Sequence, residues 1–267
     1  MRGTAQISSR DNANLKEARR IRDGKQLDKI FIEGARLVAE AIRSRLEIEM
    51  LFLSDGGMTR AEELLGTELP GELFELTDSA FHSIADTVTS QGLVAIARRP
   101  PTGRSEVEKG LATTSTPIVT FLHQTNNPSN LGAVVRTSEA AGASGLIVSA
   151  GSADAFSPKA LRAAMGSSLR LPIWTDVELG EALEWADQNN LQTVATEIGA
   201  TRSYADIDWK RPSILLLGSE AHGLSKAGLE HVDEKIVIPM ERSVESLNLA
   251  VACGVILFEA RRQNSAG

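Results

Sequence analysis

Three short polar segments in the second half of the chain each follow a predicted buried strand, and they carry side chains that could do chemistry. The segments are HQTNNPSN (123–130), GSEAHGLS (218–225) and ERSVESLN (241–248), which follow PIVTFL, SILLL and KIVIPM. In open α/β sheets, ligands bind at the carboxyl ends of the strands. The three segments are therefore predicted to line one polar edge of a sheet.

This polar edge would present Asn130, Arg136, Glu220, Ser246 and Asn248. Arg136 has apolar and small neighbours, where a guanidinium needs an anionic partner or a cleft; an ordinary ion pair is the alternative. Asn130 and Ser246 can each cap the helix that follows. Asn248, at the start of a purely apolar run, has little local reason to be polar. The set suits an anionic, hydroxyl-bearing substrate, and it does not name the reaction.

Several familiar kinds of site are not encoded. No G-x-G-x-x-G segment follows a strand, and the chain has no Walker loop and no G-x-S-x-G elbow. The four histidines lack metal-binding spacing, and the one cysteine, Cys253, rules out an internal disulfide and a cysteine-based zinc site. Gly218, at the end of its strand, would permit close approach of the backbone to a ligand. We therefore expect neither a nicotinamide dehydrogenase nor a metal site.

Extended and helical patterns alternate through residues 117–267, which predicts an α/β domain with a mostly parallel sheet and helices on both faces. The final helix is expected to begin at Leu247. Its buried stripe is predicted to consist of Leu247, Ala250, Val251, Gly254, Val255 and Phe258, with Cys253 as core packing beside it.

Residues 1–98 show the pattern of a smaller α/β domain. The segment DNANLKEARRIRDG predicts a helix with an Asp or Asn cap and a stop at Gly24, and KIFIEG, IEMLFLSD and GLVAIA predict strands. Residues 99–116 hold paired prolines and many small polar residues, which predicts a linker with one short helix.

The composition is that of an ordinary globular protein, with 42% hydrophobic and 24% charged residues. The net charge of −7 argues mildly against nucleic acid as a partner. However, basic residues gather near the N-terminus at Arg10, Lys16, Arg19 and Arg20. They form either a phosphate-binding stripe or a solvated helix face. No apolar run is long enough to span a membrane and no secretory signal is evident, so we expect a cytoplasmic protein.

The three polar segments, in this order, resemble the three signature motifs of the SpoU/TrmH branch of the SPOUT RNA methyltransferases. The matching stretches are NNPSNLGAVVRTSEAAGASGLIV, LLLGSEAHGLS and IPMERSVESLNLAVACGVILFEARRQ, and the resemblance covers nearly all of residues 117–263. The first half more weakly resembles the L30e-like substrate-binding domain found ahead of this catalytic domain, through FIEGARLVAEA and QGLVAIAR. One departure is SLNLAVA, where the family more often has SLNVSVA.

The resemblance implies a ribose 2′-O-methyltransferase that uses S-adenosylmethionine, a trefoil knot at the C-terminus and a homodimer. It implies that backbone around the knot holds the cofactor, at positions that correspond to Thr196, Gly218, Ile238, Met240 and Leu247. Arg136 corresponds to the arginine proposed to act as base or orienting group, with Asn130, Glu220, Ser246 and Asn248 completing the site. Arg162 corresponds to a basic position implicated in RNA contact, and the N-terminal basic residues are further candidates.

Large-subunit (23S) ribosomal RNA is the expected substrate, because minimal tRNA enzymes of this family often lack the extra N-terminal domain. The alternatives are a tRNA 2′-O-methyltransferase, an antibiotic-resistance methyltransferase of the same build, and a non-catalytic RNA-binding protein on the same scaffold. The full set of candidate site residues argues against the last of these.

Overall fold

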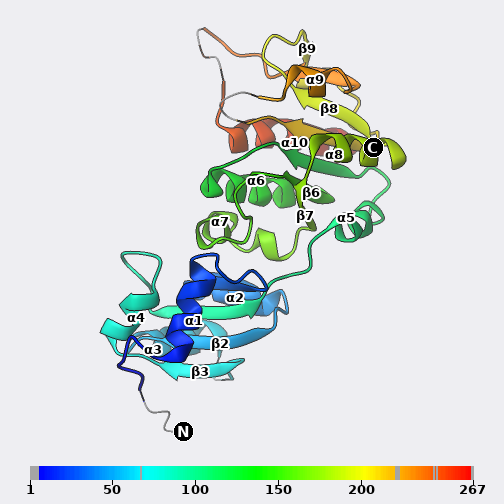
Figure 1. Ribbon diagram of the computed structural model, residues 1–267. Helices are drawn as coiled ribbons and strands as arrows, with labels where there is room; N and C mark the ends of the chain where they lie inside the picture. The colour runs from blue at the N-terminus through cyan, green and yellow to red at the C-terminus, as the bar shows by residue number, and fades with distance from the viewer. Residues whose placement is uncertain (1–5, 67, 220–222, 243, 245, 266–267) are drawn as a thin grey trace. The chain divides into compact units, whose positions relative to one another are not determined.

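In a computed structural model of the protein, residues 6–66, 68–219, 223–242, 244 and 246–265 are described (Figure 1). The chain divides into two compact units. The first consists of Met1–Pro100 with Phe156–Arg170, and the second of Pro101–Ala155 with Leu171–Gly267. Among the described residues, no helix combines the length and the apolar character needed to cross a bilayer.

The first unit is built on a four-stranded sheet in the order β1-β4-β2-β3. Strand β4 pairs antiparallel with β1 and β2, and β2 pairs parallel with β3. The strands are β1 (Lys29–Glu33), β2 (Ile48–Leu53), β3 (Glu72–Glu75) and β4 (Leu93–Arg98), and the helices are α1 (Ala13–Arg22), α2 (Ala35–Arg43), α3 (Gly57–Leu65), α4 (Asp78–Ile84), α7 (Pro158–Ala164) and the 3₁₀ helix η1 (Ser167–Leu169).

Helix α1 follows the sequence prediction closely. The Asn12 side chain accepts a hydrogen bond from the Asn14 amide, and Gly24 takes a left-handed φ of 69° just beyond the end of the helix. Its buried face, Leu15, Ala18 and Ile21, packs in a core with residues of the sheet and of α4. Local capping and helical spacing were therefore sufficient to predict this element.

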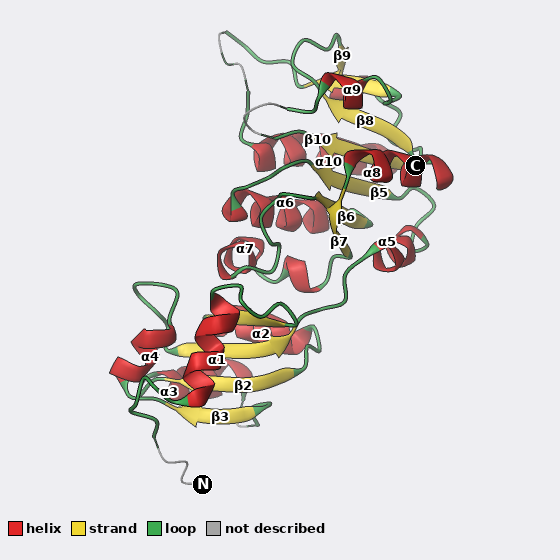
Figure 2. Cartoon of the chain, viewed as in Figure 1, coloured by secondary structure: helices red, strands yellow, loops and turns green. Residues whose placement is uncertain are grey.

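The second unit is built on a seven-stranded sheet in the order β7-β6-β5-β10-β8-β11-β9, and all of its neighbouring strands are parallel (Figure 2). The predicted mostly parallel α/β sheet is thereby confirmed. The strands are β5 (Ile118–Leu122), β6 (Gly145–Ser149), β7 (Ile173–Val177), β8 (Gln192–Thr196), β9 (Arg202–Ser203), β10 (Ser213–Leu217) and β11 (Glu234–Val237). The helices are α5 (Arg104–Leu111), α6 (Pro128–Ala141), α8 (Leu179–Gln188), η2 (Tyr204–Asp206), α9 (Lys226–Leu229) and α10 (Leu249–Ser265).

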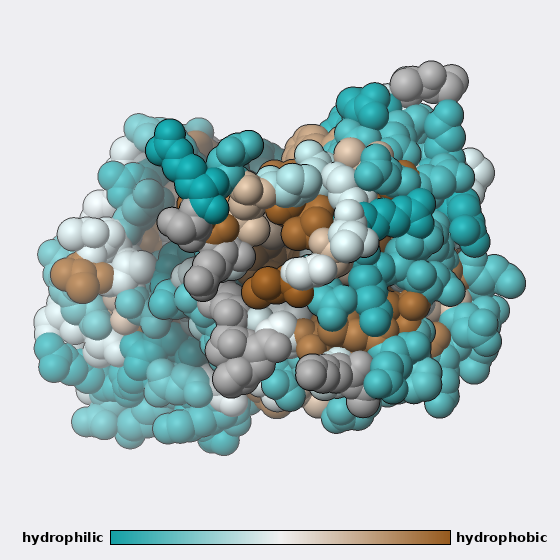
Figure 3. All heavy atoms as spheres, turned by 90° about the horizontal axis from the view of Figure 1, so that it is seen from above, coloured by the Kyte–Doolittle hydropathy of each residue, from teal (hydrophilic) through white to brown (hydrophobic). Residues whose placement is uncertain are grey.

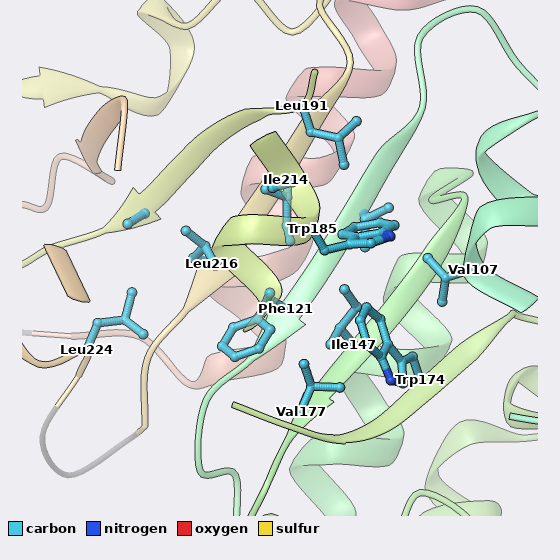
Figure 4. Packing of buried hydrophobic residues seen from close by; sticks show 14 of the residues in the cluster. Val107, Phe121, Ile147, Trp174, Val177, Trp185, Leu191, Ile214, Leu216 and Leu224 are labelled. Carbon is cyan, nitrogen blue, oxygen red and sulfur yellow. The ribbon is translucent and has the colours of Figure 1, made fainter. Parts of the chain in front are cut away.

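Helices cover both faces of this sheet, as predicted. On one face, α5 and α8 bury Val107 and Trp185 against alternate strand residues such as Phe121 and Ile147 (Figure 4). On the other face, Ser138 of α6 bonds to Thr120 of β5, whose side chain points opposite to that of Phe121 because strand side chains alternate. Helix α10 lies against α6 on this second face.

The start of α10 and its buried stripe differ from the sequence prediction. The helix begins at Leu249, not at Leu247. Its buried residues are Leu249, Cys253, Ile256, Leu257 and Ala260, whereas Leu247, Val251 and Phe258 of the predicted stripe are exposed. Because apolar residues occur on every side of this helix, spacing alone could not identify the side that faces the sheet. Core packing of Cys253 is confirmed, since its side chain is fully buried.

Candidate active site

The three polar segments leave the carboxyl ends of neighbouring strands. Leu122 at the end of β5 pairs with Leu217 at the end of β10, and Ala195 of β8 pairs with Leu216. Strand β11 lies on the other side of β8, where Ile236 pairs with Thr196. The segments after β5, β10 and β11 therefore emerge along one edge of the sheet, as the sequence predicted.

Two of the predicted site residues, Asn130 and Asn248, are in direct contact although 118 positions separate them in the chain. The side-chain Nδ2 of Asn248 donates to Oδ1 of Asn130 at 3.3 Å. Asn130 lies in the first turn of α6, and Asn248 immediately precedes α10. This hydrogen bond joins the first polar segment to the third.

Helix capping at this contact differs from the prediction at both helices. The N-cap of α6 is Asn127, whose Oδ1 accepts from the Ser129 amide at 3.0 Å, and not Asn130. The cap of α10 is Asn248, whose Oδ1 accepts from the Ala250 amide at 3.0 Å, while Ser246 is exposed. Asn248 therefore has a local reason to be polar, which is helix capping. Its oxygen caps α10 while its amide binds Asn130.

The Asn130–Asn248 contact is held by close packing of α6 along α10. A Cβ atom placed on Gly254 would lie 3.3 Å from Cγ2 of Thr137, so the backbone of α10 lies close against this side chain of α6. Farther along, Arg261 Nη1 donates to the carbonyl oxygen of Ala140 at 2.7 Å. The contacts follow the same order along both helices, so the helices run parallel and their N-termini meet at the polar edge.

Arg136 lies on the exposed side of α6. Val134 and Val135 turn toward the core while Arg136 turns outward, so its apolar neighbours in the sequence do not enclose it. Within the described part of the chain, neither an ion pair nor a hydrogen bond of Arg136 is found. The guanidinium is thus accessible to an anion from solvent.

At three of the five expected cofactor positions, the main-chain groups are not used in backbone hydrogen bonds among the described residues. Among the described residues, the main-chain groups of Ile238, Met240 and Leu247 make no backbone hydrogen bonds. Donors and acceptors of this kind fit the polar edge of an adenosine group. Thr196 lies at the end of β8, and its hydroxyl donates weakly to the carbonyl oxygen of Leu216 at 3.5 Å.

Gly218 is required by its own loop. A Cβ atom there would lie 2.3 Å from the carbonyl carbon of Gly223, and Ser219 and Gly223 exchange backbone hydrogen bonds of 3.2 and 2.9 Å. The space beside Gly218 is therefore filled by the chain itself, and the glycine allows the loop to fold back. Glu220 lies outside the described residues.

His123 and Cys253 have shifted pKa values near this site. Burial lowers the pKa of the His123 imidazole, whose Nδ1 atom is buried with no hydrogen-bond partner among the described residues. Burial raises the pKa of the Cys253 thiol to about 12. Cys253 is therefore an unreactive core residue. In the described part of the chain, no group of three or more His, Cys, Asp or Glu side chains could hold a metal ion.

The candidate RNA-binding residues all lie in the first unit, and most are engaged with neighbouring residues. Arg162 Nη2 forms a 2.7 Å ion pair with Asp86, with the Arg162 side chain 31% exposed. On α1 and just before it, Arg10 and Arg19 donate to the hydroxyls of Ser79 and Ser83 at 3.0 and 3.1 Å. The two remaining residues are exposed, Lys16 with an ion pair to Asp11 at 3.1 Å and Arg20 at the surface of α1.

Comparisons with known proteins agree with this architecture. Residues 117–258 match the SpoU rRNA Methylase family, and residues 10–95 match the MRM3-like substrate binding domain. An uncharacterized tRNA/rRNA methyltransferase of Synechocystis is 32% identical over 97% of this chain and 94% of its own length. The 23S rRNA (guanosine(2553)-2′-O)-methyltransferase of Bacillus subtilis is 29% identical over 96% of this chain and 99% of its own length.

A solved structure is similar over almost the whole chain. The SpoU methyltransferase AviRb from Streptomyces viridochromogenes, in complex with the cofactor AdoMet, superposes with a TM-score of 0.84 at 26% identity. The match covers 96% of this chain and 99% of the other.

Proposed function

Because the chain belongs to the SpoU rRNA Methylase family, we propose that it transfers a methyl group from S-adenosylmethionine to a ribose 2′-hydroxyl of large-subunit ribosomal RNA. The observation that carries the proposal is the Asn130–Asn248 hydrogen bond, which joins the first and third signature segments at the ligand-binding edge of the sheet. The predicted family, the α/β fold and the assignment as an RNA methyltransferase are confirmed by the comparisons.

The chemistry divides between the cofactor and the protein. S-adenosylmethionine, when bound, supplies an already activated methyl group, so the chain must position the ribose hydroxyl and assist removal of its proton. A guanidinium is effectively always protonated at neutral pH. We therefore assign Arg136 the role of orienting the hydroxyl and the adjoining phosphate through paired hydrogen bonds. Its exposure on α6 leaves it free to meet RNA.

The remaining polar groups of the three segments complete the proposed site. Asn130 and Asn248 offer fixed amide groups, because each is held by the other and Asn248 is also held by its helix. Glu220 and Ser246 are included in the proposed site because their segments resemble the second and third signature motifs of the family. The cofactor is assigned to the backbone at Ile238, Met240 and Leu247, with Thr196 and Gly218 at the neighbouring strand ends. The open backbone groups of the first three support this assignment.

The outer face of α10 supports the proposal that the protein is a homodimer. Val251 and Phe258 on this helix are 51% and 47% exposed, and Leu247 just before it is 37% exposed. Figure 3 shows apolar side chains reaching the surface among polar ones. Large exposed apolar groups in register along one helix are typical of a covered interface. The trefoil knot and the cytoplasmic location stay predictions that follow from the family and the substrate.

RNA contact is assigned to Arg162 and to the basic residues of α1 and its approach, Arg10, Lys16, Arg19 and Arg20. The match of residues 10–95 to a substrate-binding domain supports this assignment for the four residues at and before α1. Arg162→Ala is expected to weaken RNA binding and to leave S-adenosylmethionine binding unchanged. Loss of both would contradict a role in RNA contact.

The function is tested by transfer of labelled methyl groups from S-adenosylmethionine to unmodified ribosomal and transfer RNA in separate reactions. We expect label in 23S rRNA only, in an alkali-resistant dinucleotide, because a 2′-O-methyl group blocks cleavage of the next phosphodiester bond. Label in tRNA alone would support the methyl-transfer reaction but contradict ribosomal RNA as the substrate. Binding of the cofactor without transfer to either RNA, including RNA from assembling ribosomal subunits, would contradict catalysis.

A further inference from the structure

The segment between β5 and α6 is held in a conformation that is unfavourable by itself. Gln124 has a left-handed φ of 46°, which costs a non-glycine residue free energy. On either side of it, Nδ1 of His123 and Oγ1 of Thr125 are buried without a hydrogen-bond partner in the described part of the chain. Such a segment keeps its conformation only when surrounding contacts impose it.

Two serines supply those contacts from the end of β6 and the turn after it. Ser149 Oγ accepts from the Gln124 amide at 2.7 Å, and Ser152 Oγ accepts from the Thr125 amide at 3.1 Å. The two hydroxyl oxygens lie 3.3 Å apart. The Ala153 amide in the same turn donates to the Thr125 carbonyl oxygen at 2.9 Å. Neighbouring strand ends are thus joined by side chains as well as by the sheet.

The hydroxyl protons can be assigned in one consistent direction. Ser149 Oγ lies 3.2 Å from the carbonyl oxygen of Ala150 and donates to it. Ser152 then donates to Ser149, since Ser149 has no second proton to give. Each serine donates once, and both amides of the left-handed segment obtain an acceptor. Replacing either serine by alanine would leave a main-chain N–H without its acceptor.

The held segment leads directly into α6, which carries the proposed chemistry. Two residues separate Thr125 from Pro128, where α6 begins, and the helix carries Asn130 and Arg136. We propose that Ser149 and Ser152 are positioning residues of the methyltransferase, which fix the entry of α6 so that Asn130 meets Asn248. This inference rests on the proposed function, since it concerns the same site, and the two serines touch no proposed substrate group themselves.

The test compares Ser149→Ala and Ser152→Ala with Ser213→Ala. Ser213 is a matched control, because it is a fully buried serine at the opposite end of β10 whose hydroxyl donates to the carbonyl oxygen of Arg211 at 2.7 Å. For the first two variants we expect kcat to fall about 10- to 100-fold, as misplaced reacting groups do. KM for S-adenosylmethionine should change less than about 3-fold, and Ser152→Thr, which keeps the hydroxyl, should restore kcat. An equal loss of kcat in Ser213→Ala would overturn the proposal.

A double-mutant cycle shows whether the serine acts through the asparagine. If Ser152 works by placing Asn130, adding Ser152→Ala to Asn130→Ala should lower kcat much less than Ser152→Ala does alone. If the fold-loss in kcat of the double variant equalled the product of the two single fold-losses, the inference would be overturned.

Amide hydrogen exchange separates this inference from the proposed function. We expect amide exchange to quicken about 10-fold or more at Gln124 in Ser149→Ala and at Thr125 in Ser152→Ala, and at neither position in Ser213→Ala. If the wild-type protein transferred no methyl group, the function would fail while this measurement still tested the serine contacts. Unchanged exchange in Ser149→Ala would refute them.

Discussion

The two faces of the seven-stranded sheet are built from different kinds of side chain. On the face covered by α5 and α8, large aromatic groups fill the space, and the rings of Trp174 and Trp185 meet edge to face with centroids 5.8 Å apart. On the face covered by α6 and α10, small and polar groups lie among aliphatic ones such as Ile256 and Leu257. Thr120 and Ser138 share a hydrogen bond of 3.2 Å, and Ser138 lies 3.9 Å from the sulfur of Cys253.

The two faces therefore have different roles. One mainly stabilises the sheet, and the other mainly fixes the positions of α6 and α10. Bulky aromatic packing removes much apolar surface from water, which stabilises the sheet. Small residues such as Gly254 let two helices lie close together, which fixes the relative position of their N-termini. The aromatic face should therefore respond to substitution mainly in stability, and the α6–α10 face mainly in activity and association. The following predictions begin with the largest expected effect.

Trp185→Ala on the aromatic face should lower the free energy of unfolding by about 3–5 kcal/mol, because it leaves a large cavity. The side chain is 1% exposed, and its Nε1 donates to Glu108 at 3.1 Å. Urea denaturation followed by circular dichroism measures the loss. Trp185→Phe, which retains a ring, should lose less; a loss below about 1 kcal/mol in Trp185→Ala would contradict the stabilising role of this face.

Arg136→Lys on the other face should lower kcat about 100-fold, a loss typical of removing one oriented hydrogen-bond donor. Lysine keeps the charge but cannot bind hydroxyl and phosphate through a planar fork. The free energy of unfolding should change by less than about 0.5 kcal/mol, because Arg136 is exposed. Steady-state methyl transfer tests the first expectation and urea denaturation the second.

A matched control for this change is Arg104→Lys on α5. Arg104 is also exposed and binds Glu108 and Gln188 on the aromatic side of the sheet. It should keep wild-type kcat. Near-full activity of Arg136→Lys would rule out the paired orienting role.

Phe258→Ser on the outer face of α10 should raise the dissociation constant of the proposed homodimer about 10- to 100-fold, since it removes one buried aromatic side chain from the interface. Sedimentation equilibrium measures the constant. Val88→Ser, at a residue that is 95% exposed in the first unit, is the control and should leave association unchanged. A wild-type protein that is monomeric at micromolar concentration would refute the homodimer.

Cys253 of α10, which lies beside Ser138 of α6, should affect stability through its ionisation only at alkaline pH. The thiol has a pKa of about 8.5 in the unfolded chain, whereas burial raises the pKa of the Cys253 thiol in the folded protein to about 12. Between these values the unfolded state has released more protons, so stability falls as pH rises. Cys253→Ala should reduce this fall between about pH 9 and 11, measured by urea denaturation at each pH.

The native thiol should also resist a thiol reagent at pH 8 until the protein unfolds. Rapid labelling of the folded protein at that pH would show that the α6–α10 face is not closely packed.

The order and type of the elements were predictable because they depend on local patterns. Runs such as IVTFL and SILLL are apolar along their whole length, as strands buried on both faces must be. Asn12 and Gly24 marked both ends of α1. The polar edge of the sheet followed from the chain direction, since parallel strands end together.

The details of the site were less predictable, because several residues could play the same local role. Asn127, Asn130, Ser246 and Asn248 are all good capping residues, and only the backbone path decides which of them accept from a helix amide. No local pattern marks Ser149 and Ser152, since serines at or just after the end of a strand are common. Their spacing from Gln124 and Thr125 has meaning only once β5 and β6 lie side by side.

The sequence alone determined the alternation of strands and helices, the polar strand ends and the three signature segments, because each depends on neighbours a few residues apart. The tertiary structure alone decided which side of α10 is buried, that Arg136 faces solvent, and that Asn248 binds Asn130 across 118 positions. The physical reason is that these outcomes depend on which surfaces meet. A helix that is apolar on every side carries no local mark of the surface that it will cover.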